Sequence, residues 1–225
     1  MSTDRVALDC AGIAALPQRF RARMVNSLSG FKSANLVGTA DASGRAACCI
    51  VSSVVHLGSD PAMLGVVFRP PGDDAHNYCN LTEAGCFTLS HVALPFFEAA
   101  HQTSARYPED ISEFEAAGLT PFWHIQDGHR FPAPAVEESP VRIGLKVMED
   151  LCLPNRCRFV IGAIQWVNFT AELQADDGFL DLAAAKTIAI GGLDAYHTAQ
   201  RVARLSYAKP DCGLVSRSDF LEGWD

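Results

Sequence analysis

The chain has 225 residues, of which 48% are hydrophobic and 20% charged, a composition typical of a folded globular protein and not of a disordered one. Its formal net charge is −8, and acidic and basic residues are mixed along its length, so we expect no nucleic-acid partner. Residues Met1–Arg5 do not begin a secretion signal, and no window approaches the ~20 apolar residues of a membrane span. We therefore expect a cytoplasmic protein with no membrane partner that folds as a single domain over residues 1–225.

The eight cysteines are spaced irregularly, and none forms a C-x-x-C pair. In a chain long enough to fold without disulfides, this pattern indicates reduced thiols. The nearest candidates for zinc ligands are two isolated pairs, Cys152 with Cys157 and His124 with His129, whereas zinc needs about four ligands at short spacings. We therefore expect no metal site.

The first half of the chain predicts one helix followed by strands. In Leu16–Leu28, Pro17 suits a first helical turn and apolar residues recur every four positions, which predicts an amphipathic helix. The turn-forming residues 41–44 separate two segments rich in small and β-branched residues, which predicts a β-hairpin over Asn35–Thr39 and Ala46–Val55. Two further apolar runs bounded by Pro and Gly predict buried strands over Met63–Arg69 and Cys86–His91.

The second half predicts helical inserts, late strands and a final helix. Pro95 and Pro108 suit helix starts and Gly118 suits a helix end, which predicts two short helices between residues 94 and 118. Alternation and β-rich composition predict strands over Val141–Leu145 and Arg158–Leu173, joined through residues 154–155. Helical spacing over Asp194–Leu205 predicts a last helix with arginines on its solvent face. The order of elements indicates a mainly β fold, a closed or partly closed antiparallel β-barrel with peripheral helices.

Packing alone does not explain three polar segments. Ser52 and Ser53 follow Val51 in an apolar strand, where each unsatisfied hydroxyl would cost about 1–3 kcal/mol, so we expect either a polar ligand or bonds to nearby backbone. Arg69 precedes a polar loop that reaches His76 and Asn77, which is either a phosphate clamp or a solvated loop.

The third segment, His101–Tyr107, is the densest polar cluster in the chain, and its hydroxyls and guanidinium suit a phosphate dianion. The sequence lacks the motifs of a dinucleotide site, a nucleoside triphosphate site and a serine hydrolase site. Gly191-Gly192 lacks the spacing of a dinucleotide fingerprint, no P-loop occurs, and no G-x-S-x-G elbow supports a hydrolase.

Five ordered motifs, which span nearly the whole chain, resemble those of the flavin reductase family, in particular its flavin oxidoreductases with a long insert after the middle strands. The motifs are residues 26–33 (NSLSGFKS), 52–58 (SSVVHLG), 101–107 (HQTSARY), 112–120 (SEFEAAGLT) and 192–197 (GLDAYH). The resemblance implies an FMN-binding split barrel of antiparallel Greek-key type, working as a homodimer with the flavin at the dimer interface.

The resemblance also implies roles for individual residues. Val51, Ser52 and Ser53 would line the flavin ring. The phosphate would lie against the two other polar segments, with these candidate cofactor-binding residues: Arg69, His76, Asn77, Thr103, Ser104, Ala105 and Arg106. Tyr196 and His197 are candidates near the reacting ring, or they pack at the start of the predicted last helix. Ala47 and Asn77 depart from the usual asparagine and threonine of the family, and the loss at Ala47 of a hydrogen bond implies weaker flavin binding.

The predicted activity is hydride transfer from NADH or NADPH to FMN, and then electron transfer to a small-molecule acceptor or to an oxygenase partner. Backbone N–H groups around Ser52 and Ser53 would stabilise charge on the ring. The alternatives are a non-catalytic FMN-binding or sensing module and a structural homologue with an emptied site.

Overall fold

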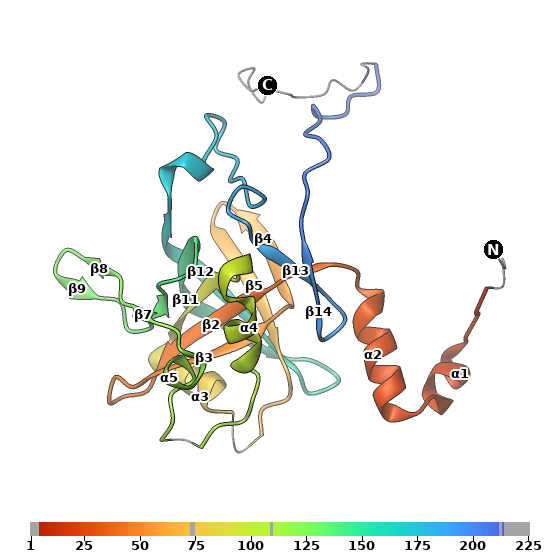
Figure 1. Ribbon diagram of the computed structural model, residues 1–225, viewed down its shortest axis with the longest axis horizontal. Helices are drawn as coiled ribbons and strands as arrows, with labels where there is room; N and C mark the ends of the chain where they lie inside the picture. Colours follow the sequence, from red (N-terminus) through yellow and green to blue (C-terminus); the bar gives the residue numbers. More distant parts are fainter. Residues whose placement is uncertain (1–4, 73–74, 109, 212, 214–225) are drawn as a thin grey trace.

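A seven-stranded antiparallel sheet forms the body of the protein in the computed structural model, which describes residues 5–72, 75–108, 110–211 and 213 (Figure 1). The sheet has the strand order β3-β2-β6-β11-β12-β5-β4. In chain order the strands are β2 (Asn35–Ala40), β3 (Ala46–Val51), β4 (Val54–Ser59), β5 (Ala62–Phe68), β6 (Cys86–His91), β11 (Val141–Cys152) and β12 (Arg158–Phe169).

The two edge strands of this sheet, β3 and β4, are consecutive in the chain and are joined by only Ser52 and Ser53. Because so short a connection holds the two edges together, the sheet curls into a barrel whose opening lies at this junction. We call residues 51–53 the seam. The predicted mainly β fold, an antiparallel split barrel, is thereby confirmed.

Two buried clusters form on the two faces of β2, whose six residues are all buried. One cluster fills the barrel, with Val37, Val66, Phe87, Leu145 and Val160 among its members. The other lies outside β2 and β3, where Leu36 and Cys48 pack against Phe96, Ala100 and Phe114. Burial on both faces explains why β2 reads as a continuous run of small and apolar residues.

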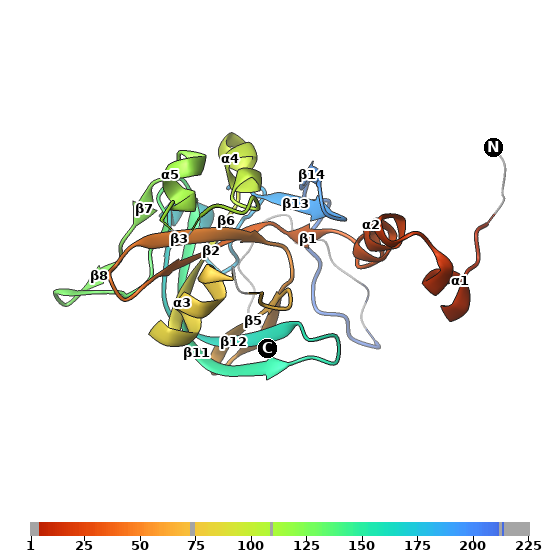
Figure 2. The ribbon, with the colours of Figure 1, turned by 90° about the horizontal axis from the view of Figure 1, so that it is seen from below.

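Short helices cover the barrel, and two helices extend away from it. The α4 (Phe97–Gln102) and α5 (Glu113–Ala117) helices lie over β3 and β6, and α3 (His76–Ala84) packs Leu81 into the barrel interior (Figure 2). By contrast, α1 (Cys10–Ala15) and α2 (Gln18–Leu28) project from the barrel and contain no buried residue. Two 3-10 turns, η1 (Leu94–Phe96) and η2 (Ala171–Leu173), complete the helical elements of the described ranges.

Three smaller sheets lie around the barrel. The first joins β1 (Lys32–Ser33), β13 (Ile188–Gly191) and β14 (Ala195–Thr198) beside the base of α2. The second pairs β7 (Pro121–Phe122) with β10 (Ala135–Val136), and the third is the projecting hairpin of β8 (Ile125–Gln126) and β9 (His129–Arg130). In the part of the chain that the structure describes, no helix has the length and apolarity needed to cross a membrane.

The predicted strand over Cys86–His91 is confirmed with the same bounds, and the helix predicted from Leu16 begins at Gln18. The hairpin after Asn35 is present, but its second strand stops at Val51. The prediction missed α3, because its His, Asn and Thr residues are weak helix formers and only the left-handed cap at Gly85 (φ 64°) signals its end.

The predicted last helix, Asp194–Leu205, is wrong. Residues 195–198 form β14, which pairs with β13, and the described residues that follow contain no helix. Local periodicity could not reveal a strand partner contributed by another segment. The two arginines expected on a solvent face are instead paired, Arg201 with Asp181 at 2.7 Å and Arg204 with Asp177 at 2.6 Å.

Candidate functional site

The seam places two half-buried serines where the barrel opens. The backbone N–H of Val67 donates to the carbonyl of Ser53 at 2.9 Å, so the seam lies beside β5, the strand directly before Arg69. Val51 packs against the apolar interior of the barrel. Neither the Ser52 nor the Ser53 hydroxyl bonds to any part of the chain that the structure describes, so the backbone partners considered as an alternative are not found there. Both hydroxyls are accessible at the half-buried opening and lack a partner in the described chain, so they are available to a polar ligand.

The residues predicted after the seam separate into exposed and buried ones. Arg69 is exposed immediately after β5, and His76 opens α3. Asn77 is buried, and its amide accepts from the Thr39 hydroxyl at 3.0 Å and donates to Glu113 at 3.3 Å. Arg69 and His76 are therefore positioned to contact a ligand, whereas the Asn77 side chain joins the barrel to α5.

The predicted residues after α4 are likewise divided between the interior and the surface. The buried Thr103 hydroxyl donates to the carbonyl of Ala100 at 2.7 Å and closes the end of the helix. A turn follows, in which the N–H groups of Ser104 and Ala105 donate to the carbonyls of His101 and Gln102. Ser104, Ala105 and Arg106 are exposed. Of the predicted hydroxyls, the structure therefore presents Ser104 at the surface and holds Thr103 inside.

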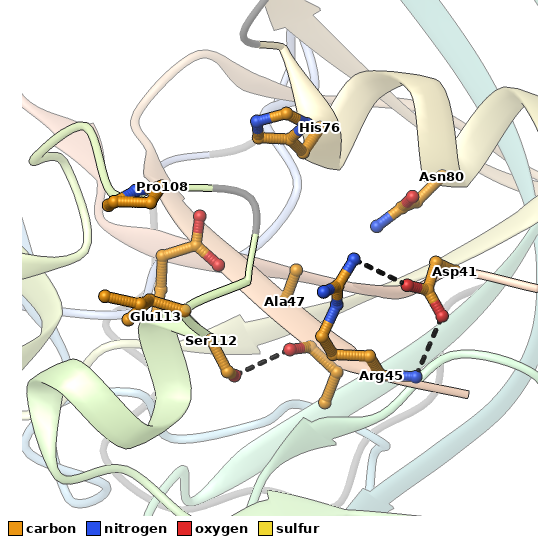
Figure 3. Close-up of a pocket in the computed structure, with 10 residues that line it drawn as sticks. Asp41, Arg45, Ala47, His76, Asn80, Pro108, Ser112 and Glu113 are labelled. Atoms are coloured by element: carbon orange, nitrogen blue, oxygen red, sulfur yellow. Dashed lines mark hydrogen bonds and ion pairs between the residues drawn. The ribbon is translucent and has the colours of Figure 1, made fainter. Parts of the chain in front are cut away.

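A small polar cavity of about 50 Å³ joins the loop after Arg106 to α3 and β3 (Figure 3). His76 and Pro108 line it together with Ala47, the position that departs from the family pattern. The cavity has room for a few water molecules and is too small for a flavin ring. It brings His76 of the second polar segment near Pro108, the residue directly after the third segment.

Two residues of this cavity, Ser112 and Glu113, were not predicted as site residues. The Ser112 hydroxyl donates to the carbonyl of Ala46 at 2.6 Å, and the Glu113 carboxylate accepts from the N–H of Cys48 at 3.2 Å. Burial raises the pKa of Glu113 above its usual value. The available signal was their position at the start of a helix, where serine and glutamate are favoured.

Tyr196 and His197 point to opposite sides of β14. The Tyr196 hydroxyl lies 2.7 Å from Nδ1 of His101, and its ring packs 5.3 Å from that of Phe97, so Tyr196 attaches the hairpin to α4. Burial raises the pKa of Tyr196, as does the nearby Asp194. His197 packs edge-on against Phe31, with ring centroids 4.7 Å apart.

His197 also faces an open groove of about 430 Å³ between α2 and the β13–β14 hairpin. One wall comes from α2 and the turn after it, and the other comes from the hairpin. We call this the arm groove, and it is lined by Arg23, Ser27, Gly30, Phe31, Gly191, Gly192, Leu193, Asp194, Ala195 and His197. Sequence analysis did not predict it.

A family comparison agrees with this geometry. The model of the flavin reductase like domain matches residues 28–183, which include the seam, α3 and the turn after α4. The chain belongs to the flavin reductase like family. The sequence resemblance to flavin reductases is therefore confirmed.

Solved structures of other proteins have the same fold. A protein from Shewanella frigidimarina that is named as a flavin reductase with split barrel domain is 46% identical, with a TM-score of 0.85 over 91% of this chain and 100% of the other. Nitrilotriacetate monooxygenase component B from Bacillus cereus is 17% identical, with a TM-score of 0.78 over 91% and 100% of the two chains. An NADH:FAD oxidoreductase from Streptomyces globisporus is 12% identical, with a TM-score of 0.63 over 88% and 99%. A comparison with curated protein sequences gave no match.

Proposed function

We propose that this flavin reductase family protein is an FMN-dependent oxidoreductase that uses NADH or NADPH as electron donor. The observation that carries the proposal is the seam, where two half-buried hydroxyls without a partner in the described chain lie at the opening of the barrel. When bound, FMN would supply a two-electron acceptor for a hydride from the donor and, once reduced, a source of that electron pair for a second substrate.

The residues of the chain would bind and orient the cofactor. The hydroxyls and backbone N–H groups of Ser52 and Ser53 would face the polar edge of the ring and stabilise negative charge there. Arg69, His76, Ser104 and Arg106 would bind the phosphate, because they are the polar candidates not held in the interior. The buried Asn77 and Thr103 would position these segments through their internal bonds.

The outer face of the barrel supports a homodimer. Val54 packs inside, so its neighbour Val55 points outward. Val55 and the nearby Leu57, which lies at an irregularity of β4, are 45% and 39% exposed. A Cβ at Gly65 would lie 2.4 Å from the Phe159 ring and 3.2 Å from Val55, so β4, β5 and β12 share this apolar outer face. Apolar surface of this kind marks an interface, and we infer that a second copy covers it beside the seam.

Light scattering tests the dimer. At micromolar concentration the protein should have twice the mass of one chain, and Val55→Glu combined with Leu57→Glu should have the mass of one. The matched control is Ile125→Glu, which places the same charge on an exposed residue of the distant β8–β9 hairpin and should remain dimeric. A monomeric wild-type protein would contradict the inference.

The names of two structural neighbours agree with this function. One is an NADH:FAD oxidoreductase, and the other is a component of a monooxygenase. For this chain, NADH is therefore a reasonable first donor to test, and an oxygenase that takes reduced flavin is a candidate partner beside oxygen, free flavin and iron.

The decisive experiment is an anaerobic visible spectrum of the FMN-reconstituted protein before and after addition of NADH or NADPH. We expect rapid loss of the oxidised-flavin bands with at least one donor. A bound flavin that stays oxidised with both donors would instead indicate a non-catalytic FMN-binding module. Protein that does not bind FMN would overturn both functions.

Substitutions test the phosphate site separately. Ser104→Ala combined with Arg106→Ala should weaken FMN binding about ten- to a hundredfold, the effect of losing about 1.5–3 kcal/mol from bonds to a charged group. Arg19→Ala, at an exposed arginine on α2, is the control and should leave FMN affinity unchanged. Unchanged affinity in the double variant would show that the phosphate binds elsewhere.

A further inference from the structure

The arm groove has the size and composition of a small-molecule site. Its volume of about 430 Å³ lies within the range of ~300–1,000 Å³ that is usual for ligand pockets. Phe31 and His197 form an aromatic pair on its surface, and the pair can pack against a flat ring.

The α2 wall of the groove carries a cation, Arg23, that can meet an anion next to that ring. The guanidinium of Arg23 is exposed and has no ion pair or hydrogen bond within the described residues. The Ser27 hydroxyl, one helical turn further along α2, donates its hydrogen to the Arg23 carbonyl at 2.8 Å, so Arg23 supplies the side-chain donors of this wall, and Asp194 is the acidic residue of the opposite wall. An arginine is well suited to a phosphate, because its planar donors match the phosphate oxygens.

The turn of the hairpin is shaped for a close approach to α2. Gly192 has a φ of 63°, in the left-handed region, and a Cβ there would lie 2.9 Å from the Ser27 hydroxyl. Glycine therefore allows the hairpin backbone to form the wall facing Ser27.

Short connections join the walls of the groove to both parts of the proposed flavin site. Phe31 precedes Asn35 by four residues, or about 13 Å of extended chain, and Asn35 pairs with Val51 of the seam. On the other wall, Tyr196 bonds to His101, which lies just before Thr103 and the turn that presents Ser104. A ligand in the groove is therefore close enough for one end to reach toward the seam.

We propose that the arm groove binds the nicotinamide nucleotide donor, with a flat ring against Phe31 and His197 and a phosphate against Arg23. This inference rests on the proposed function, because it assigns the donor site of that reaction. It gives the projecting α2 helix a role that packing in the barrel does not supply.

The test uses NAD⁺ and NADP⁺, the products of donor oxidation, as probes that bind without being consumed. Isothermal titration measures their affinity for the FMN-reconstituted protein, and a separate fluorescence titration measures FMN affinity. Ala195→Trp places a large side chain in the groove, and Arg23→Gln removes the charge without touching the barrel. Ala171→Trp, at an exposed residue of η2 outside the groove, is the matched control.

We expect Ala195→Trp to weaken binding of the preferred probe at least tenfold and Arg23→Gln to weaken it about three- to tenfold, with FMN affinity unchanged in both. The control should bind both ligands like the wild type. The proposal is overturned if the wild type binds neither probe, if both variants keep wild-type probe affinity, or if they lose FMN to the same extent, which would make the groove part of the flavin site. Failure of the proposed function is a different result, because the flavin would then stay oxidised with NADH and NADPH whatever the groove binds.

Discussion

Nδ1 of His101 on α4 lies 2.7 Å from the hydroxyl oxygen of Tyr196 on β14, a contact between residues 95 positions apart in the chain. The two rings also pack edge-on, with centroids 5.6 Å apart. This pair connects the turn that presents Ser104 and Arg106 to the hairpin that forms one wall of the arm groove. Movement of either segment therefore affects the other.

The His101–Tyr196 bond should be measurable as a coupling energy. His101→Gln and Tyr196→Phe should each lower the free energy of unfolding by about 1 kcal/mol, and the double variant should lose about 1 kcal/mol less than the sum. Urea unfolding of the four proteins completes the cycle. Strictly additive losses would show that the hydrogen bond contributes no stability.

Stability should fall on mild acidification because of His91. Burial lowers the pKa of this histidine from 6.5 to about 4, so the unfolded chain takes up a proton between these values that the folded chain does not. The neutral form is fully populated above pH 6.5, and stability is lost as the pH falls toward 4. Between pH 7.5 and pH 5 the loss from this one group is about 2 kcal/mol.

Urea unfolding at the two pH values tests this prediction. His91→Gln should remove most of the His91 contribution, since glutamine does not titrate. An identical pH dependence in wild type and variant would assign the effect to other groups.

Glycine is required at position 144 because the Trp166 side chain lies directly over this residue. A Cβ at this position would lie 2.0 Å from Nε1 of the buried Trp166, whose ring also stacks on His124 at 4.4 Å. Gly144→Ala should therefore lower the free energy of unfolding by about 3 kcal/mol, because neither neighbour can move freely.

Gly58→Ala is the control for Gly144→Ala. A Cβ at Gly58 meets its nearest atom at 3.5 Å, an ordinary contact, so this variant should lose less than about 1 kcal/mol. Thermal unfolding of both variants measures these losses of stability, and equal losses would show that the Trp166 ring moves to accommodate the new methyl group.

The cysteines should differ sharply in reactivity. Burial raises the pKa of Cys49 to about 12 and that of Cys86 to about 11, and it raises the pKa of Cys48 as well. Cys10, Cys79 and Cys152 are exposed. Because the thiolate is the reactive form, brief iodoacetamide treatment at pH 8 should label the three exposed cysteines and spare the three whose pKa is raised.

Peptide mass spectrometry reads out the labelling, and the same treatment in urea should modify both groups. Labelling of Cys48 or Cys49 in the native protein would show that β3 opens readily.

Sequence reasoning identified the parts of this molecule that depend on local patterns. The strand Cys86–His91 follows a glycine cap and is almost continuously buried, so composition alone delimits it. The seam could be suspected from two serines in an apolar run, but its place at the barrel opening depends on β3 pairing with β2 and β4 pairing with β5. Those pairings are set by the whole sheet.

The features that were missed depend on contacts between distant segments. Asn77 and Thr103 looked like phosphate contacts because their residue types suit that role, and only the structure shows their side chains bonded inside. The arm groove was not predicted because Phe31 and His197 lie near opposite ends of the chain. The strand β14 was mistaken for a helix for the same reason, since its partner β13 is invisible to a local window.

The absence of any buried residue in α1 and α2 has an evolutionary consequence. Substitutions in these helices leave both interior clusters of the barrel intact, so selection for folding constrains them little. Under the proposed donor role, Arg23 and Ser27 could change and alter the preferred nucleotide while the scaffold remained the same. Homologous proteins with the same barrel could thus diverge in nucleotide preference through substitutions in a segment that contributes little to folding stability.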